Sequence, residues 1–249
     1  MSEQPSDSLR ELYERRAEQL YAEPSSRRGR KFEGVWALLA GCLPCESFLD
    51  AGCGDGRYLV EVGDRAGRLA GLDISEGILA TAREALKGAG LEADLRQGNL
   101  EALPFADGEF DLVLCSQVIE HLLAPERGLA ELARVLGSSG RLLLTTDNSQ
   151  TLSRVLNAPR TGLLRLLRGR KPAFEFPHRS FAVREIADLI EAVGLRPERI
   201  ETFRFHLDKP LDEAHLPFVQ RSLDALDRAL PQHRFGDIVA VRARKLSPG

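Results

Sequence analysis

The pattern of apolar and polar positions divides the chain into a helical start and a long alternating region. Residues 6–22 and 31–42 carry apolar side chains at helical spacing, so we predict two helices there, separated by a break at Pro24 and Gly29. From position 47 to position 148, short apolar runs alternate with amphipathic segments. Such alternation is typical of a parallel β-sheet with helices packed on both faces.

The alternating region predicts a series of short strands and longer helices. The strands are expected at residues 47–52, 68–75, 93–99, 110–117 and 141–148. The helices are expected at residues 56–66, 76–90 and 124–140, and the last of them ends on the glycine-rich stretch GSSG. The alternation stops near residue 151 and resumes with a helix at 181–195, a strand within 196–207, a helix at 213–230 and a closing strand at 235–245.

The composition fits a single domain. The chain has 249 residues, of which 43% are hydrophobic and 29% charged, and this is enough for one well-buried core. No apolar run approaches the roughly 18 residues of a membrane span, and no signal peptide is recognisable, so we expect a cytoplasmic protein. We divide the domain into a helical lid (1–44), a core (45–147), a basic cap segment (148–180) and a C-terminal part of the sheet with a helical insertion (181–249).

The cysteines and the net charge bear on whether the chain binds a metal or nucleic acid and whether it forms disulfides. Cys42 and Cys45 form one C-x-x-C pair, but no second pair of ligands with zinc-site spacing accompanies it. We therefore expect buried free thiols, no metal and no disulfide framework. The net charge of −3 provides no general basic field, so nucleic acid is not an expected partner.

The segment SFLDAGCGDGRYLVEV, residues 47–62, carries the first chemical signal. Gly52, Gly54 and Gly56 follow an apolar strand, where a parallel sheet usually binds its ligand. A dinucleotide motif beginning at Gly52 would need glycine at position 57, where this chain has Arg57. Asp50 would repel a pyrophosphate, but it would suit a ligand that carries an ammonium group.

A second acid, Asp73, ends the next predicted strand, 17 residues after Gly56. An acid at this place in a nucleoside-binding unit accepts hydrogen bonds from ribose hydroxyls. Alternatively, Asp73 could only cap the helix that follows it. Its position behind the glycine turn favours the ribose interpretation.

These motifs resemble, in order, the sequence blocks of the class I S-adenosylmethionine-dependent methyltransferases, especially the small-molecule group. The blocks are FLDAGCGDGRYL, GLDIS, QGNLEALPFADGEFDLVLCSQVIEHL, LAELARVLGSSGRLLLTT and FAVREIADLIEAVGL. The closing segment FGDIVAVRARK fits the antiparallel last strand of that family. The resemblance implies an α/β fold with a Rossmann-like, doubly wound sheet of seven strands, and S-adenosylmethionine as the cofactor.

The resemblance also implies a role for each motif residue. The turn at Gly52, Gly54 and Gly56 would approach the methionine part of the cofactor, with Asp50 near its amino group. Asp73 and Ile74 belong to the ribose motif. The remaining cofactor contacts would be Asn99 at the adenine amino group, where the family usually has aspartate, Leu100 as backbone donor and apolar wall, and Cys115 and Ser116 near the sulfonium.

Two histidines are candidates for a general base, which would help a hydroxyl acceptor by about 10² to 10⁴-fold. His121 follows the fourth strand, and His178 lies in the segment after the fifth. Alternatively, His121 could be a helix-terminal residue bonded to backbone, and His178 an exposed loop residue. Tyr13 and Tyr21 could close over the cofactor or pack onto the core.

Residues 151–184 contain eight basic residues and one acidic residue. This segment could cap the substrate pocket, bind an anionic or lipid-like acceptor, or form a solvated helix face.

The sequence favours methylation of a small molecule, with oxygen as the preferred atom, by a monomer or homodimer. The alternatives are a cofactor-binding protein without catalysis, and methylation of a lipid or quinone, of RNA or of protein. The segment CSQV after the fourth strand lacks the N/D-P-P-Y/F tetrapeptide of amino-group methylation.

Overall fold

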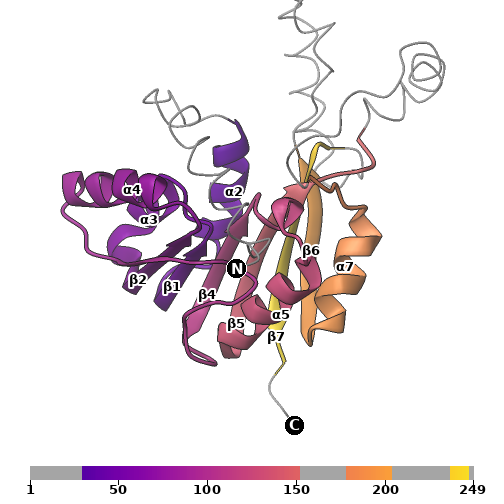
Figure 1. The fold of residues 1–249 in the computed structure, drawn as a ribbon. Coiled ribbons are helices and arrows are strands. Elements are labelled where there is room, and N and C mark those ends of the chain that lie inside the picture. The colour runs from indigo at the N-terminus through magenta and orange to yellow at the C-terminus, as the bar shows by residue number, and fades with distance from the viewer. Residues whose placement is uncertain (1–29, 152–177, 204–235, 247–249) are drawn as a thin grey trace, which may run out of the picture.

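The computed structural model describes residues 30–151, 178–203 and 236–246, which form one mixed sheet with helices on both faces (Figure 1). The sheet has seven strands in the order β3-β2-β1-β4-β5-β7-β6. The strands are β1 (Cys45–Ala51), β2 (Ala66–Asp73), β3 (Asp94–Gln97), β4 (Phe110–Ser116), β5 (Leu136–Asp147), β6 (Leu195–Phe203) and β7 (Ile238–Lys245).

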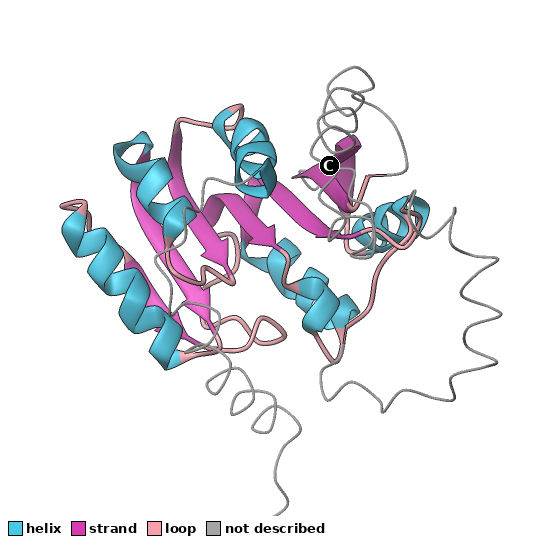
Figure 2. Ribbon diagram, turned by 90° about the horizontal axis from the view of Figure 1, so that it is seen from above, coloured by secondary structure: helices cyan, strands magenta, loops and turns pink. Residues whose placement is uncertain are grey.

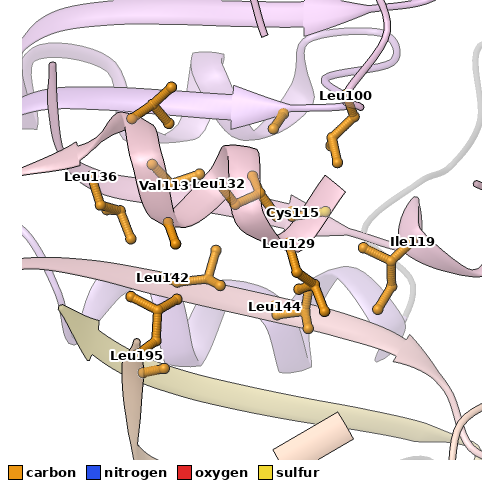
Figure 3. Close-up of a cluster of buried hydrophobic side chains, with 14 of the residues drawn as sticks. Leu100, Val113, Cys115, Ile119, Leu129, Leu132, Leu136, Leu142, Leu144 and Leu195 are labelled. Atoms are coloured by element: carbon orange, nitrogen blue, oxygen red, sulfur yellow. The ribbon is translucent and has the colours of Figure 1, made fainter. Parts of the chain in front are cut away.

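The helices cover the two faces of the sheet, as the view from above shows (Figure 2). Helices α2 (Arg30–Ala40), α3 (Arg57–Val62) and α4 (Glu76–Gly88) place apolar side chains in one cluster, together with Phe48 of β1 and Leu143 of β5. Helices α5 (Pro125–Val135) and α7 (Val183–Ala192) pack on the opposite face, against residues such as Val113 and Leu144 (Figure 3). Two short 3-10 helices are η1 (Gly63–Arg65) and η2 (Ile119–His121).

The strand directions confirm the predicted topology. β1 pairs in parallel with β2 and β4, β2 with β3, and β4 with β5. β7 lies between β5 and β6 and is antiparallel to both. Because β1 has β2 on one side and β4 on the other, the strand order reverses at β1, and the carboxyl ends of β1 and β4 face the crevice where such sheets bind ligands.

Two predicted elements differ from those observed. The helix expected at 56–66 is shorter, because α3 ends at Val62 and one 3-10 turn leads directly into β2 at Ala66. The GSSG stretch expected to stop helix 124–140 lies inside β5. Between the pairs Phe110–Leu136 and Leu112–Arg141, β4 advances by two residues and β5 by five, so the sheet absorbs this stretch as a bulge.

Several sequence predictions fall outside the described residues. They are the helix at 6–22 with Tyr13 and Tyr21, most of the basic cap segment, and the helix at 213–230. The division of the chain into lid, core, cap and C-terminal part therefore stays a prediction. Within the residues that the structure describes, no helix has the length and apolarity needed to cross a membrane.

Candidate functional site

The carboxyl ends of the parallel strands bring polar residues to one edge of the sheet. Asp50 lies near the end of β1, Asp73 ends β2, Ser116 ends β4 and Asp147 ends β5. These strands are neighbours in the order β2-β1-β4-β5. The edge therefore has two regions: a glycine turn and two acids at β1 and β2, and a cluster with histidines at β4 and β5.

The glycine turn after β1 has a conformation that side chains cannot adopt without strain. Gly52, Gly54 and Gly56 have φ angles of 96°, 54° and 75°. A Cβ atom added to Gly52 would lie 2.2 Å from Cγ2 of Val118, so no side chain fits there. The amide of Gly52 donates a hydrogen bond to the carbonyl of Leu72 at 2.7 Å, which fixes the turn against β2.

Asp50 is buried, and one oxygen of its carboxyl group has no partner among the described residues. Only 1% of its surface is exposed, and among the described residues no hydrogen-bond donor reaches its Oδ2 atom. Burial, and then the neighbouring charges of Asp73 and Asp55, raise the pKa of the Asp50 carboxyl well above its ordinary value. A buried carboxylate with an unpartnered oxygen is costly in the ligand-free protein. A cationic ligand group, such as an ammonium, would supply the missing partner.

Asp73 connects the glycine turn to the start of α4. Its Oδ2 atom accepts a hydrogen bond from the amide of Gly54 at 3.0 Å, and its Oδ1 atom accepts one from the amide of Ser75 at 3.0 Å. The capping role considered for Asp73 belongs instead to Ser75, whose hydroxyl accepts from the amide of Ile78 at 3.2 Å. The ribose role of Asp73 stays a prediction.

The loop after β3 lies beside the end of β2. The amide of Gly98 donates to the carbonyl of Asp73 at 2.9 Å, and Nε2 of Gln97 donates to the carbonyl of Ile74 at 3.2 Å. Oδ1 of Asn99 accepts from the amide of Glu101 at 2.9 Å, which leaves one of its lone pairs for another donor. Leu100 is buried in the cluster under α5.

The two residues predicted near the sulfonium point to different faces of the sheet. Cys115 is fully buried in the apolar cluster of Figure 3, so its thiol does not open to the edge, and any contact there would use its backbone. The hydroxyl of Ser116 lies 3.0 Å from that of Thr145, and it interacts electrostatically with the phenol of Tyr58.

Tyr58 and Val118 lie beside predicted cofactor residues, Ser116 and Gly52 respectively, and the sequence did not lead us to name them. Tyr58 stacks on Phe32 of α2, with ring centroids 5.1 Å apart, and burial raises the pKa of its phenol. The position of Tyr58 in the sequence, two residues after Gly56, could have pointed to it. The contact of Val118 with Gly52 depends on tertiary structure, and no local signal marks it.

The two candidate histidines meet at the ends of β4 and β5. The ring centroids of His121 and His178 are 5.3 Å apart. Nε2 of His178 lies 3.1 Å from Oδ2 of Asp147, an acid that the sequence analysis did not single out. The structure therefore places both histidines, with a carboxylate, at the ends of β4 and β5, which follow β1 in the sheet on the side away from β2.

All four cysteines are free thiols, and Cys42, Cys53 and Cys115 are buried. Cys42 and Cys45 line a cavity of about 300 Å³ near the amino ends of β1 and β4, away from the glycine turn. Across the described ranges, no group of three or more histidine, cysteine or acidic side chains is arranged to hold a metal ion.

A family model described as "Methyltransferase domain" matches residues 49–144, which include the glycine turn, both acids and β4. Residues 49–144 of the chain therefore form a methyltransferase domain. This confirms the resemblance on which the sequence analysis relied. The seven strands and the antiparallel β7 agree with the sheet that the resemblance implied.

The methyltransferase domain has relatives among known proteins. A Mycolicibacterium smegmatis protein named "Probable S-adenosylmethionine-dependent methyltransferase" is 32% identical over 169 residues, which cover 68% of this chain and 59% of that protein. A ubiquinone biosynthesis O-methyltransferase of Hahella chejuensis is 34% identical over 107 residues, 43% of this chain and 45% of that enzyme. A solved S-adenosylmethionine-dependent methyltransferase from Mesorhizobium loti superposes with a TM-score of 0.57 at 22% identity, covering 84% of this chain and 97% of that one.

The similarity covers only part of the curated relatives. The chain spans 59% of the Mycolicibacterium smegmatis protein and 45% of the Hahella chejuensis enzyme. The similarity therefore concerns the methyltransferase domain and its fold. An acceptor named for one of these relatives is a property of that relative.

Proposed function

We propose that the protein transfers the methyl group of S-adenosylmethionine to a small molecule, with a hydroxyl oxygen as the acceptor atom. The observation that carries this proposal is the Asp50 carboxylate, buried with a free oxygen beside three glycines in the left-handed region. The domain match supports it. When bound, S-adenosylmethionine supplies an activated methyl group on a sulfonium, so the protein needs mainly to position the reactants and exclude water.

The residues of the turn region fit this cofactor. Asp50 would face its amino group, and the backbone of Gly52, Gly54 and Gly56 would approach its methionine part. Asp73 would accept hydrogen bonds from the ribose, next to Ile74. Asn99 would accept from the adenine amino group with its remaining lone pair, Leu100 would form the apolar wall, and Ser116 and the backbone of Cys115 would lie near the sulfonium.

Oxygen is the proposed acceptor atom for two reasons. A hydroxyl group benefits from a base that removes its proton during transfer, and two imidazoles lie at the ends of β4 and β5. Relatives at 34% identity include an enzyme named as a ubiquinone biosynthesis O-methyltransferase. The basic residues of 151–184 suit an anionic or lipid-like acceptor, and high salt would then weaken acceptor binding without weakening cofactor binding.

The first test is thermal unfolding with S-adenosylmethionine, S-adenosylhomocysteine and NAD in separate titrations. A ligand at about 100 times its dissociation constant adds about 2.7 kcal/mol, which should raise the midpoint by roughly 5 °C or more at this size. We expect a shift with the two sulfur ligands and none with NAD. The absence of a shift with either sulfur ligand would contradict cofactor binding.

The second test is a screen for S-adenosylhomocysteine formation with soluble phenols, catechols, carboxylic acids and amines. Turnover with hydroxyl compounds and not with amines would support oxygen as the acceptor atom. A cofactor shift without turnover on any acceptor class would favour the alternative, a cofactor-binding protein that lacks catalysis.

A further inference from the structure

The histidine region consists of three segments that backbone hydrogen bonds hold together. The amide of Arg179 donates to the carbonyl of Glu120 at 2.9 Å, which places His178 beside His121. The amide of Phe181 donates to the carbonyl of Asp147 at 2.9 Å, and the amide of Ser149 donates to the carbonyl of Phe181 at 2.9 Å. The two imidazoles and Asp147 therefore occupy positions that the main chain fixes.

Asp147 differs from the other charged groups around His178 because its carboxylate contacts the ring. The carboxylate of Glu120 is buried and accepts from the hydroxyl of Thr146 at 3.0 Å. The guanidinium of Arg179 pairs with Glu185 and, at 3.5 Å, with Glu126. The backbone of Asp147 is held in β5 by its pairing with Ile238 of β7.

The geometry of this pair determines which ring nitrogen of His178 can accept a proton. An ionised carboxylate only accepts hydrogen bonds, so the neutral imidazole must carry its proton on Nε2, which lies 3.1 Å from Oδ2 of Asp147. Nδ1 then keeps its lone pair. Because 40% of the His178 side chain and 38% of the Asp147 side chain are exposed, the ring can also exchange protons with water.

We propose that His178, rather than His121, is the general base, and that Asp147 is its positioning residue. This inference rests on the proposed methyl transfer to a hydroxyl group. In the proposed transfer, the acceptor oxygen would form its new bond to the methyl carbon as the carbon–sulfur bond of S-adenosylmethionine breaks and S-adenosylhomocysteine leaves. The proton of the acceptor oxygen moves to Nδ1 of His178, and the imidazolium that results is stabilised by the Asp147 carboxylate. The proton then passes to water, which restores the neutral ring. His121 packs against His178 and limits its orientation.

The tautomer of His178 is the first test, and it needs no acceptor. Nitrogen-15 spectra of the neutral imidazole should show the Nε2–H form in the wild-type protein and in Asp147→Asn, because the asparagine carbonyl can still accept from Nε2. Asp147→Ala should give a mixture of the two forms. Asp188→Ala, which removes an exposed acid on α7, is the matched control and should leave the spectrum unchanged.

The kinetic test uses 3,4-dihydroxybenzoate as a hydroxyl probe and measures S-adenosylhomocysteine. We expect His178→Gln to lower kcat by about 100-fold and Asp147→Ala by about 10-fold, with the KM for S-adenosylmethionine unchanged. The kcat of Asp147→Asn should lie between those of the wild type and Asp147→Ala, because asparagine keeps the orientation of the His178 ring and loses the negative charge. Asp188→Ala should match the wild type.

The outcomes separate this inference from the function on which it rests. If the wild type turns over but Asp147→Ala changes neither the tautomer nor kcat, the positioning role is wrong and methyl transfer stands. If His121→Gln abolishes turnover and His178→Gln does not, the base is His121. If the wild type binds no S-adenosylmethionine and methylates no hydroxyl probe, both proposals are overturned.

Discussion

The two regions of the sheet edge are built in different ways. At β1 and β2, a backbone hydrogen bond fixes the glycine turn against Leu72, and a Cβ atom on Gly52 would lie 2.2 Å from Val118. At β4 and β5, His178 and Asp147 are half-exposed and meet through one side-chain contact of 3.1 Å. The first region has a shape that tolerates little change, whereas the second can vary its side chains while the backbone stays in place.

This difference suits methyl transfer. Every enzyme of this kind must hold the same cofactor, so a turn that the backbone fixes is useful at the cofactor end. Acceptors differ from one enzyme to another, and a side-chain cluster at the neighbouring strands can change with them. The following variants test the contrast, from the largest expected effect to the smallest.

Gly52→Ala should have the largest effect. The new methyl group would collide with Val118 at a φ angle of 96°, so we expect a loss of about 3–5 kcal/mol in the free energy of unfolding, measured by urea denaturation. Gly90→Ala is the control, because Gly90 has a φ angle of 70° and open space around it, and it should cost only about 1–2 kcal/mol. Equal losses in the two variants would contradict the steric argument.

Asp50→Asn should stabilise the ligand-free protein and weaken cofactor binding. Burial disfavours the ionised form of Asp50, so removing this carboxyl should raise the free energy of unfolding by about 1–3 kcal/mol at pH values above its folded pKa. The affinity for S-adenosylmethionine, measured by calorimetry, should fall at least about tenfold, because the ammonium partner is lost. Asp107→Asn, at an exposed acid that pairs with Arg134, should leave the affinity unchanged and lower the free energy of unfolding by at most about 1 kcal/mol. A stabilised variant with unchanged affinity would remove Asp50 from the cofactor site.

The pH dependence of stability should report on the same carboxyl. Because the pKa of Asp50 is raised in the folded protein, the folded state holds its proton at pH values where the unfolded chain has lost it. The contribution of Asp50 to stability should therefore decrease as the pH rises from about 4 to the folded pKa, and stay constant above it. Urea denaturation across this range should show a shallower decrease for Asp50→Asn than for the wild type. If the free energy of unfolding decreased equally with pH in both proteins, Asp50 would not be the group that causes the decrease.

Ser75→Ala should have the smallest effect. It removes the hydroxyl that caps α4 and leaves Asp73 in place, so we expect a loss of about 1 kcal/mol in the free energy of unfolding. Ser139→Ala, in the exposed bulge of β5, should stay within about 0.5 kcal/mol of the wild type. A larger loss in affinity for S-adenosylmethionine than in stability would show that Asp73 depends on Ser75 for its orientation.

The sequence predicted the features that are local in the chain. The parallel direction of the first five strands follows from short apolar runs and intervening helices, and the glycine turn follows from spacing within a few residues. Asp73 was predicted at the end of β2, where the structure has it. These features depend on neighbours in sequence, so their pattern was visible without any coordinates.

Other features depend on contacts between distant residues and could not be predicted. The pairing of Asp147 with His178 follows from a bridge between Asn148 and Phe181, two residues that no local pattern relates. The face to which Cys115 points was hidden because β4 is apolar on both sides. The GSSG stretch resembles a helix stop, and only the register between β4 and β5 shows that it is a bulge.

The position of β7 has a consequence for biosynthesis. This strand follows β5 and β6 in the sequence, but it lies between them in the sheet. While the chain emerges from the ribosome, β5 and β6 therefore have no permanent neighbour on their facing edges until residues 238–245 are available. Nascent chains that end before β7 should expose two open strand edges, which are templates for aggregation and natural targets for chaperones.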